Sequence, residues 1–346
     1  MRVLLVCAAP RGSRTGNRRT AERWAVLLRR LGHRVRISAE LAPADVVIAL
    51  HARHSAAAVV RATVPVVLAL TGTDLYGDIH HDPAAIAALA RADRLVVLHD
   101  HAIADLPAER RGVARVIRQS ARAPVRPVAR AKGELRVAVV GHLREVKDPL
   151  LAARAARTLP ERSRISVVHA GSALEPAFAA AARAEERTNP RYRWLGELSP
   201  ARALRLIAGA HVLVLSSRSE GGANVLGEAI ACRTPVIATD IAAARAALGD
   251  DYPALFPVGD LDALAQLLAR FETDRAWRAE LARRIARRRP LFAERTELAA
   301  WRALLAELPV GRTRPAVRAR GRTGRRRASD RGRGLRRAAS ARRSRA

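Results

Sequence analysis

The sequence has few cysteines, few aromatic residues and no long apolar run, and each shortage excludes a class of protein. Two cysteines, Cys7 and Cys232, cannot form a disulfide framework, and both lie in apolar segments typical of a core in a reducing compartment. No apolar run approaches the roughly 18 residues that a membrane helix needs. The apolar start of the chain gives way to arginines at Arg11, too early for a signal peptide. We therefore expect a cytoplasmic protein without a membrane span.

Positive charge is what the sequence has in excess, with 63 basic residues against 32 acidic ones. All of the basic residues except Lys132 and Lys147 are arginines, a bias that a genome rich in G and C can produce. Residues 311–346 hold 15 arginines and a single acid, Asp330, with almost no large apolar side chain. A segment of this composition cannot bury a core, so we expect a disordered, Arg-rich tail over 309–346.

A basic tail can make weak contact with nucleic acid or another acidic surface, and such binding would depend strongly on salt. Aromatic residues make up only 3% of the chain, so its body lacks the stacking side chains of a nucleic-acid-binding domain. Nucleic-acid binding therefore stays an alternative for the tail alone.

Short apolar and β-branched runs alternate with helical patterns through most of the chain. Continuous apolar strands separated by helices are typical of parallel sheets covered on both faces, which indicates an α/β protein. In the first half the expected strands are Val3–Ala9, Val35–Ser38, Val46–Leu50, Val64–Leu70, Arg94–Leu98 and Val113–Ile117. In the second half they are Leu135–Val140, Ile165–Ala170, Tyr192–Leu195, His211–Leu215 and Val236–Ala238.

Two such halves predict two Rossmann-like, doubly wound domains that face a cleft. A stretch with prolines and a glycine but no apolar run separates them and is typical of a linker. We expect the first domain over 1–121, the linker over 122–134, the second domain over 135–290 and a C-terminal packing helix over 291–308. In the first domain, Asn17 is expected to cap a helix that ends near Gly32.

The stretch Ser216–Glu228 joins an apolar strand to an almost wholly apolar helix through two adjacent glycines. Glycines let the backbone approach a ligand, and the free N–H groups of a helix start attract an anion such as a phosphate. Glu228 is the only charged residue between Ala223 and Cys232, and a buried carboxylate needs a hydrogen-bond donor. A ligand hydroxyl would serve, and a cap or a buried salt bridge is the alternative.

A second glycine turn with basic residues, Gly141–Lys147, follows the first strand of the second domain and can hold a diphosphate. In the first domain the loop Pro10–Arg19 carries glycines and four arginines at a helix start, which suits a small anion, although plain surface arginines are the alternative. This loop does not match the dinucleotide fingerprint. The polar loop Thr71–Tyr76 ends another strand, so that Asp74 and the threonines can bond sugar hydroxyls or, alternatively, form an Asx-type turn.

Two patterns look like metal sites but have simpler explanations. His80 and His81 lie beside an aspartate without a third ligand nearby, which favours a plain loop pair. Asp260-Leu261-Asp262 sits where a helix is expected to begin, so that capping by Asp260 explains it better. No serine or cysteine triad has local support.

Together these motifs resemble the family-4 glycosyltransferases of GT-B architecture, over about residues 2–308. Glu220 and Glu228 match the family's Glu-x7-Glu motif, and Lys147 matches the lysine of its glycine-turn element. The resemblance implies that Lys147 holds a nucleotide diphosphate, that Glu228 binds ribose hydroxyls and that Glu220 contacts the donor sugar. It also implies that backbone amides hold the diphosphate, those of Gly221, Gly222, Ala223, Asn224 and Val225. A UDP-sugar would be a substrate, and we expect no cofactor and no metal requirement.

Three positions depart from the family pattern. His142 stands where an arginine is usual, so that Arg144 is expected to supply the second positive charge. Thr71 stands where many members have a catalytic histidine, which argues against an ordinary hydroxyl acceptor. Arg233 replaces a usual glycine.

A narrower resemblance, to the selenosugar synthases of selenoneine biosynthesis, fits these departures and is carried by residues 71–76, 141–145, 216–225 and 251–253. It implies UDP-N-acetylglucosamine as donor, selenophosphate as a small anionic acceptor and a 1-seleno-sugar as product. A selenium nucleophile is already anionic and needs cationic binding groups more than a general base. The catalytic candidates are Glu220, Asp74 and Thr71. The first loop, with Gly12, Arg14 and Gly16, is expected to bind the acceptor's phosphate.

The alternative is a GT-B glycosyltransferase with the same UDP-sugar donor and another acceptor, such as a thiol, a lipid or a glycan. It would keep the donor site in the second domain and change only the first domain.

Overall fold

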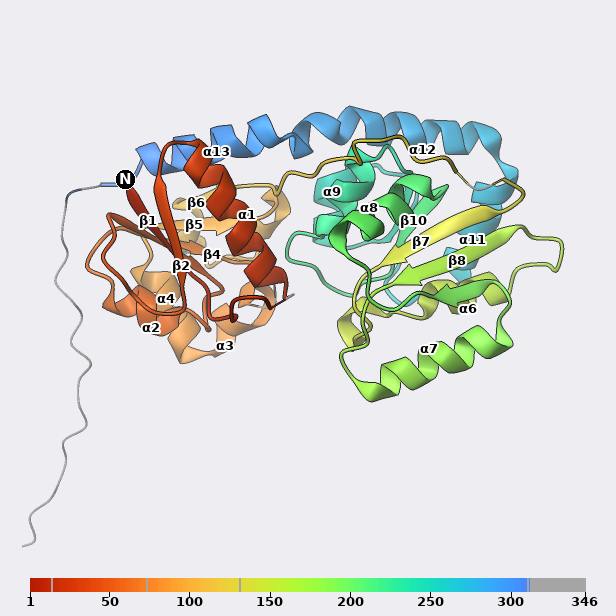
Figure 1. Cartoon of the computed structure of the whole chain (residues 1–346), viewed down its shortest axis with the longest axis horizontal. Coiled ribbons are helices and arrows are strands. Elements are labelled where there is room, and N and C mark those ends of the chain that lie inside the picture. The colour runs from red at the N-terminus through yellow and green to blue at the C-terminus, as the bar shows by residue number, and fades with distance from the viewer. Residues whose placement is uncertain (14, 73, 131, 310, 312–346) are drawn as a thin grey trace, which may run out of the picture. The chain divides into compact units, whose positions relative to one another are not determined.

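The computed structural model describes residues 1–13, 15–72, 74–130, 132–309 and 311 of the chain. These residues form two six-stranded sheets in which every strand pair is parallel (Figure 1). The predicted α/β class is therefore confirmed. The expected disordered tail, 309–346, lies outside the described residues except for Pro309 and Gly311.

The first sheet contains β1 (Arg2–Val6), β2 (Arg34–Ser38), β3 (Val46–Leu50), β4 (Val66–Ala69), β5 (Arg94–Val97) and β6 (Ala114–Val116). Their order is β2-β1-β3-β4-β5-β6, so that the direction of winding reverses between β1 and β3. Successive side chains of a strand point to opposite faces. Along β3, Val47 and Ala49 therefore join one core, whereas Ile48 and Leu50 join another.

Helices cover both faces of this sheet. On one face, Trp24 and Leu28 of α1 (Gly16–Arg30) pack with Trp301 of the last helix, α13 (Glu294–Ala306). On the other face lie α2 (Ala56–Arg61) and α4 (Pro83–Arg91). Shorter helical segments are the π-helical η1 (Asp74–Asp78), α3 (Ile79–His81), the 3-10 helix η2 (Asp100–Ile103) and α5 (Ala108–Arg111).

The second sheet contains β7 (Leu135–Val140), β8 (Ile165–Ala170), β9 (Tyr192–Trp194), β10 (Val212–Leu215), β11 (Val236–Thr239) and β12 (Leu255–Phe256). Their order is β12-β11-β10-β7-β8-β9, so that the winding reverses between β7 and β10. One continuous apolar core surrounds this sheet. The described residues between β6 and β7, which include the expected linker, form no helix or strand.

The helices of the second domain are α6 (Leu151–Arg157), α7 (Pro176–Thr188), α8 (Pro200–Gly209), α9 (Asn224–Ala231), α10 (Ala242–Leu248), α11 (Leu261–Thr273) and α12 (Arg275–Arg288). Two 3-10 segments, η3 (Glu145–Lys147) and η4 (Arg289–Phe292), complete it. Asp260 caps α11 by accepting a hydrogen bond from the N–H of Ala263 at 2.9 Å, as the sequence predicted. None of the helices in the described ranges combines the length and apolar character needed to cross a membrane.

The sequence misplaced some local features. Thr15, not Asn17, is the N-cap of α1, and Asn17 lies in the first turn, where its amide oxygen accepts a hydrogen bond from Thr71. The expected end is correct, because Gly32 with φ +86° directly follows the helix end. The strand β12 was not predicted, because two residues are too few to give a pattern. Both cysteines are free, but Cys7 lies just past β1 and Cys232 is only half-buried.

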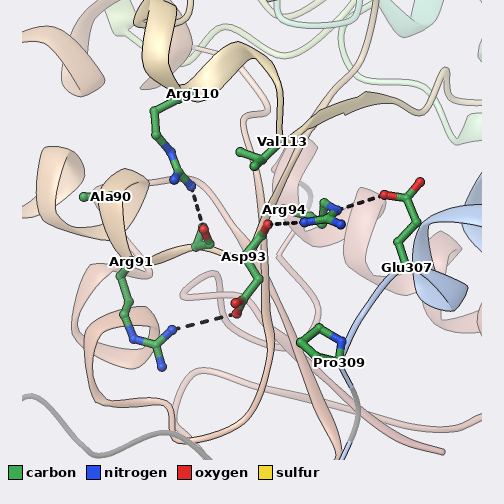
Figure 2. Close-up of a pocket in the computed structure, with 9 residues that line it drawn as sticks. Ala90, Arg91, Asp93, Arg94, Arg110, Val113, Glu307 and Pro309 are labelled. Carbon is green, nitrogen blue, oxygen red and sulfur yellow. Dashed lines mark hydrogen bonds and ion pairs between the residues drawn. The ribbon is translucent and has the colours of Figure 1, made fainter. Parts of the chain in front are cut away.

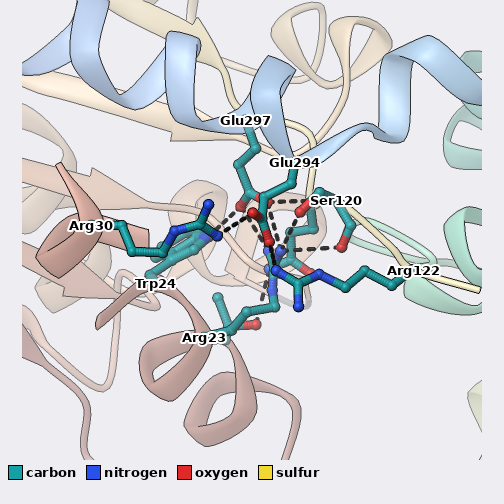
Figure 3. Close-up of polar contacts among 9 residues, drawn as sticks. Arg23, Trp24, Arg30, Ser120, Arg122, Glu294 and Glu297 are labelled. Atoms are coloured by element: carbon teal, nitrogen blue, oxygen red, sulfur yellow. Dashed lines mark hydrogen bonds and ion pairs between the residues drawn. The ribbon is translucent and has the colours of Figure 1, made fainter. Parts of the chain in front are cut away.

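The C-terminal packing helix, α13, belongs to the core of the first domain, although it follows the second domain in sequence. Glu297 on α13 is 1% exposed, and its carboxylate accepts two hydrogen bonds from Arg23 at 2.6 and 2.7 Å (Figure 3). The indole of Trp24 and the N–H of Ser120 donate two more, at 3.0 and 2.7 Å. One buried carboxylate thus joins α1, α13 and the segment that leaves the first domain.

We predict that Glu297→Gln lowers the free energy of unfolding by about 2–4 kcal/mol, because the Arg23 guanidinium loses its buried counter-ion. Chemical denaturation measures the loss. Glu294→Gln, one turn earlier on α13, removes a half-buried carboxylate that pairs with the exposed Arg30 and Arg122, and should cost less than about 1 kcal/mol. Equal losses in the two variants would show that the buried cluster has no special role.

Candidate functional site

The candidate site lies at the carboxyl ends of β7 and β10, where the winding of the second sheet reverses. Connections leave two such neighbouring strands in opposite directions, and the crevice between them is where open α/β sheets bind ligands. A small pocket occurs at this place, and the residues that line it include Gly141, His142, Lys147, Ser216 and Ser217. The two loops that the sequence singled out therefore meet at one sheet edge.

Hydrogen bonds join these two loops directly. The hydroxyl of Ser216 donates to the carbonyls of Lys147 and Asp148, at 2.9 and 3.0 Å. The N–H of Arg218 donates to the carbonyl of Val146 at 2.8 Å. The loops are thus a single hydrogen-bonded unit, in which the backbone around Lys147 is tied to the second loop.

Lys147 and Glu220 form an ion pair at the centre of this unit. The hydroxyl of Ser217 donates to the same carboxylate oxygen of Glu220 at 2.6 Å. Both charged side chains are largely buried, at 21% and 10% exposed, so that each depends on the other for compensation. Ser217 is a residue that the sequence interpretation missed, since a serine before a glycine turn carries no distinguishing signal.

Two histidines shape the Gly141 turn. His169 is 1% exposed, and its Nε2 donates to the carbonyl of Gly141 at 3.2 Å, so that its Nδ1 accepts from the hydroxyl of Tyr192 at 3.1 Å. Burial lowers the pKa of His169 to about 4, so this ring is neutral. His142 is half-buried, and its Nδ1 lies 2.8 Å from the hydroxyl of Ser172. Burial lowers its pKa too, with a contribution from nearby arginines and Lys147, so that it adds no positive charge near pH 7.

The other candidate cation, Arg144, is exposed beside this turn. Among the described residues its side chain has no hydrogen-bond or ion-pair partner. Its guanidinium is therefore available for a ligand, and its role as the second positive charge stays a prediction.

The helix α9 begins directly after the two glycines. Ala223 precedes it in the left-handed region, with φ +41°. This backbone conformation is energetically unfavourable for any residue that has a Cβ. The first N–H groups of a helix have no partner within the helix, and those of Asn224 and Val225 lie here. Asn224 is exposed and Val225 half-buried, so that the amide end of α9 is open to a ligand.

Gly221 and Gly222 have a role that the sequence did not indicate, because they lie against the first domain. A Cβ on Gly221 would lie 2.3 Å from the carbonyl oxygen of Thr71, and one on Gly222 would lie 2.6 Å from a methyl group of Leu98. Real Cβ contacts are essentially never shorter than 3.0 Å. These glycines permit the contact of the two domains, in addition to any approach of a ligand.

Glu228 lies one turn into α9 and is half-buried. Its carboxylate has no hydrogen-bond or ion-pair partner among the described residues, so neither the cap nor the salt bridge occurs in this part of the chain. Burial raises the pKa of Glu228 to about 7, and the positive charge of Arg19 partly opposes this rise. A buried carboxyl without a partner is a place where a ligand hydroxyl can donate.

The structure corrects the interpretation of Asp74. This residue is fully buried, and its carboxylate accepts hydrogen bonds from the N–H groups of Thr71 (3.1 Å), Gly72 (2.9 Å) and Ala52 (3.0 Å). Asp74 therefore shapes the loop, as the Asx-type alternative predicted, and its carboxylate is not open to a sugar. The half-buried Thr71 donates to the side chain of Asn17 at 2.7 Å.

The expected anion loop of the first domain is only partly explained. Gly12 has φ +84°, which favours glycine, and Gly16 is the exposed first residue of α1, whereas Arg14 lies outside the described residues. Arg18 is occupied by an ion pair with Glu22 at 2.7 Å. Arg19 is exposed and acts electrostatically on both Glu228 and His142 of the second domain, so it is the arginine of α1 that faces the candidate site.

The remaining candidates do not form a further site. Within the described ranges no group of three potential metal ligands occurs, and His80 and His81 pack only as a tilted pair. Arg233 adopts φ +58°, the region that favours the glycine it replaces.

A larger pocket, of about 440 Å³, lies in the first domain where β5 begins (Figure 2). Its arginines are engaged: Arg91 pairs with Asp93, Arg94 pairs with Glu307, and Arg110 donates to the carbonyl of Ala92. Ligands of open α/β sheets bind at the carboxyl ends of strands, so this pocket at the amino end is not the candidate site.

Solved structures resemble this fold over nearly its whole described length. One is HepE (Alr3699) from Anabaena, solved with UDP and glucose, with a TM-score of 0.69, 16% identity and coverage of 89% of this chain and 100% of that chain. Another is sucrose-phosphate synthase from Thermosynechococcus elongatus, with a TM-score of 0.71, 15% identity and coverage of 88% and 98%. At these identities the likeness shows the fold, which is the GT-B fold.

The sequence of the second domain is also similar to known proteins. Residues 124–289, just under half of the chain, match the family model described as "Glycosyl transferases group 1". A curated relative, "Putative teichuronic acid biosynthesis glycosyltransferase TuaC" of Bacillus subtilis (strain 168), is 36% identical over 76 residues. That match spans 22% of this chain and only 20% of the relative.

We predict that Glu228→Gln stabilises the protein more at pH 8 than at pH 5. With a folded pKa near 7, above its usual 4.5, the carboxyl makes the folded state less stable as the pH rises from about 4.5 to 7, because only the unfolded chain releases the proton freely. The glutamine removes this cost, so the gain in the free energy of unfolding should be about 2 kcal/mol larger at pH 8 than at pH 5. Denaturation at several pH values measures it, and a constant difference would exclude a raised pKa.

Proposed function

We propose that this protein is a glycosyltransferase that uses a UDP-sugar as donor. The observation that carries the proposal is the convergence of Lys147, the open amide end of α9 and the unpartnered Glu228 at the β7/β10 crevice. A nucleoside diphosphate sugar has a matching group for each of these: phosphate oxygens for the lysine and the amides, and ribose hydroxyls for the carboxylate.

Because Lys147 and Glu220 form an ion pair, a ligand that binds Lys147 also changes the contacts of Glu220. A diphosphate competes with Glu220 for the ammonium group of Lys147, because its oxygens carry more negative charge. The Glu220 carboxylate, still bonded to Ser217, is then free to accept from hydroxyls of the donor sugar. Diphosphate binding and sugar recognition are thereby coupled through one lysine.

The comparisons support the donor class. HepE, which shares the fold, was solved in complex with UDP-glucose, and the family of residues 124–289 consists of glycosyl transferases. Since the identity is low, the donor of this chain is argued from its own residues. Lys147 and the start of α9 supply the positive charge that a metal would otherwise provide, and we propose that no metal is needed.

For the finer specificity we propose UDP-N-acetylglucosamine as donor and selenophosphate as acceptor. The selenium of the acceptor attacks C1 of the sugar and forms the C1–Se bond. The bond from C1 to the diphosphate oxygen breaks, and UDP leaves with its electron pair. Water then cleaves the Se–P bond of the sugar selenophosphate ester, which releases phosphate and the 1-seleno-sugar. The selenium is already anionic, so no base is required, which suits a site where Thr71 donates to Asn17 and Asp74 is bonded to backbone amides.

Arg19 is the residue that we assign to the acceptor. It is exposed on the first turn of α1, and its charge reaches Glu228 and His142, so that a small anion between the domains would meet it. The start of α1 adds partial positive charge at the same place.

The experiment is to incubate the protein with UDP-N-acetylglucosamine and selenophosphate, with and without EDTA. UDP release is measured, and a selenium-containing sugar is sought by mass spectrometry. We expect UDP and the seleno-sugar in both samples. UDP release only with a thiol, lipid or glycan acceptor would overturn the selenophosphate proposal, and no binding or turnover of any UDP-sugar would overturn the glycosyltransferase proposal.

We predict that Lys147→Ala lowers kcat/KM by about 10²- to 10³-fold, because the diphosphate loses the cation that stabilises its leaving charge. The control is Lys132→Ala, which removes the only other lysine, an exposed side chain, and should change kcat/KM by less than about twofold. A Lys147 variant as active as the control would exclude the assigned diphosphate site.

We also predict that Arg19→Ala raises the KM for the acceptor about tenfold or more and leaves the KM for the donor nearly unchanged. Arg29→Ala, an exposed arginine at the other end of α1, is the control and should alter neither constant. An increase confined to the donor's KM would assign Arg19 to the diphosphate instead.

A further inference from the structure

Tyr76 and His99 form a hydrogen-bonded chain that the proposed mechanism does not use. The Nδ1 of His99 accepts from the N–H of Ala102 at 3.1 Å, so the proton of this ring is on Nε2. Nε2 donates to the hydroxyl oxygen of Tyr76 at 3.1 Å. The Tyr76 hydroxyl in turn donates to the backbone carbonyl of Glu220 at 3.0 Å. The chain therefore runs in one direction, from the first domain into the second.

The donors and acceptors in this series of hydrogen bonds keep their roles near neutral pH. His99 is 4% exposed, and burial lowers its pKa to about 4, so the ring stays neutral and keeps one donor and one acceptor. Burial also raises the pKa of the Tyr76 hydroxyl far above its usual value, so that it stays a donor. Asp100 beside the ring is itself paired with Arg118 at 2.8 Å.

Other residues of the first domain contact the two glycines that follow Glu220. The backbone of Thr71 and Gly72 lies against Gly221, and Leu98 lies against Gly222. Glu220, Gly221 and Gly222 are thus each held by the first domain. Near these contacts His101 of η2 lies 3.3 Å from Asp250, just beyond α10 of the second domain.

Glu220 is therefore held from two sides. Its carboxylate is bonded to Lys147 and Ser217 of its own domain, whereas its carbonyl is bonded to Tyr76 of the other domain. A shift of the first domain away from the loop would break the second bond and leave the first intact. The backbone position of Glu220, and with it the reach of its carboxylate, depends on contact between the domains.

We propose that Tyr76 and His99 are positioning residues that place Glu220 for the reaction only while the two domains are in contact. This inference rests on the proposed function, because it assumes that Glu220 contacts the donor sugar. Binding of the UDP part of the donor by the second domain does not need the Tyr76 bond, whereas placement of the sugar for the transfer step does. The two residues should therefore affect turnover more than donor affinity.

The test compares Tyr76→Phe with the unaltered protein. Phenylalanine keeps the ring and removes only the hydroxyl. We expect kcat for UDP release to fall about five- to tenfold, in line with one buried hydrogen bond of about 1 kcal/mol, while the Kd for UDP, which lacks the sugar, stays within twofold. His99→Leu, which removes the donor to Tyr76, should give a similar fall, and the double variant should be little worse than either, because both act through one chain.

Tyr252→Phe is the matched control. The Tyr252 hydroxyl is also buried and donates to a backbone carbonyl, that of Val236 at 2.8 Å, but both residues belong to the second domain. This variant should lose stability without losing kcat. If Tyr76→Phe leaves kcat unchanged, or weakens donor binding while kcat is unchanged, the positioning role is overturned. If the unaltered protein neither binds nor turns over a UDP-sugar, the proposed function itself fails.

Discussion

The contact between two backbones, at Gly221 and at Thr71–Gly72, is the constraint on which the candidate site depends. A single Cβ at Gly221 would lie 2.3 Å from a carbonyl oxygen, so no other residue permits this approach. Because the loop can come so close, Tyr76 reaches the carbonyl of Glu220 and Leu98 covers Gly222. The same loop then enters α9 through Ala223 in a left-handed conformation. The glycines of a phosphate-binding turn are thus also the glycines of a domain contact.

The site also holds groups that lower stability unless a ligand is bound. Glu228 is a half-buried carboxyl with a raised pKa and no hydrogen-bond or ion-pair partner in the described part of the chain, and Ala223 has an unfavourable backbone conformation. Such features persist where the surrounding structure enforces them, and they are common at functional sites. The ion pair of Lys147 with Glu220 has the opposite effect, because it satisfies two buried charges until a diphosphate competes for the lysine.

The last helix, α13, stabilises the position of α1, which carries one residue of the proposed site. Glu297 on α13 bonds Arg23 and Trp24 of α1 and the backbone of Ser120. Arg19, the cation proposed to meet the acceptor, lies on the first turns of the same α1. The second domain is thereby inserted between two parts of the first domain, and both connections leave from around one buried carboxylate.

The sequence by itself determined the α/β class, almost all of the strands and the two loops of the second domain. Apolar runs, glycine turns and the spacing of Glu220 and Glu228 are local signals, which one pass along the chain can detect. The sequence could not decide which partner a polar side chain would take, because partners come from distant segments. The carboxylate of Asp74 accepts from backbone amides, and the side chain of Asn17 accepts from Thr71. Arg18 pairs with Glu22, whereas its neighbour Arg19 acts on the second domain. Nor could it show that Gly221 and Gly222 meet the first domain, because only the packed domains bring residues 71–98 and 220–222 together.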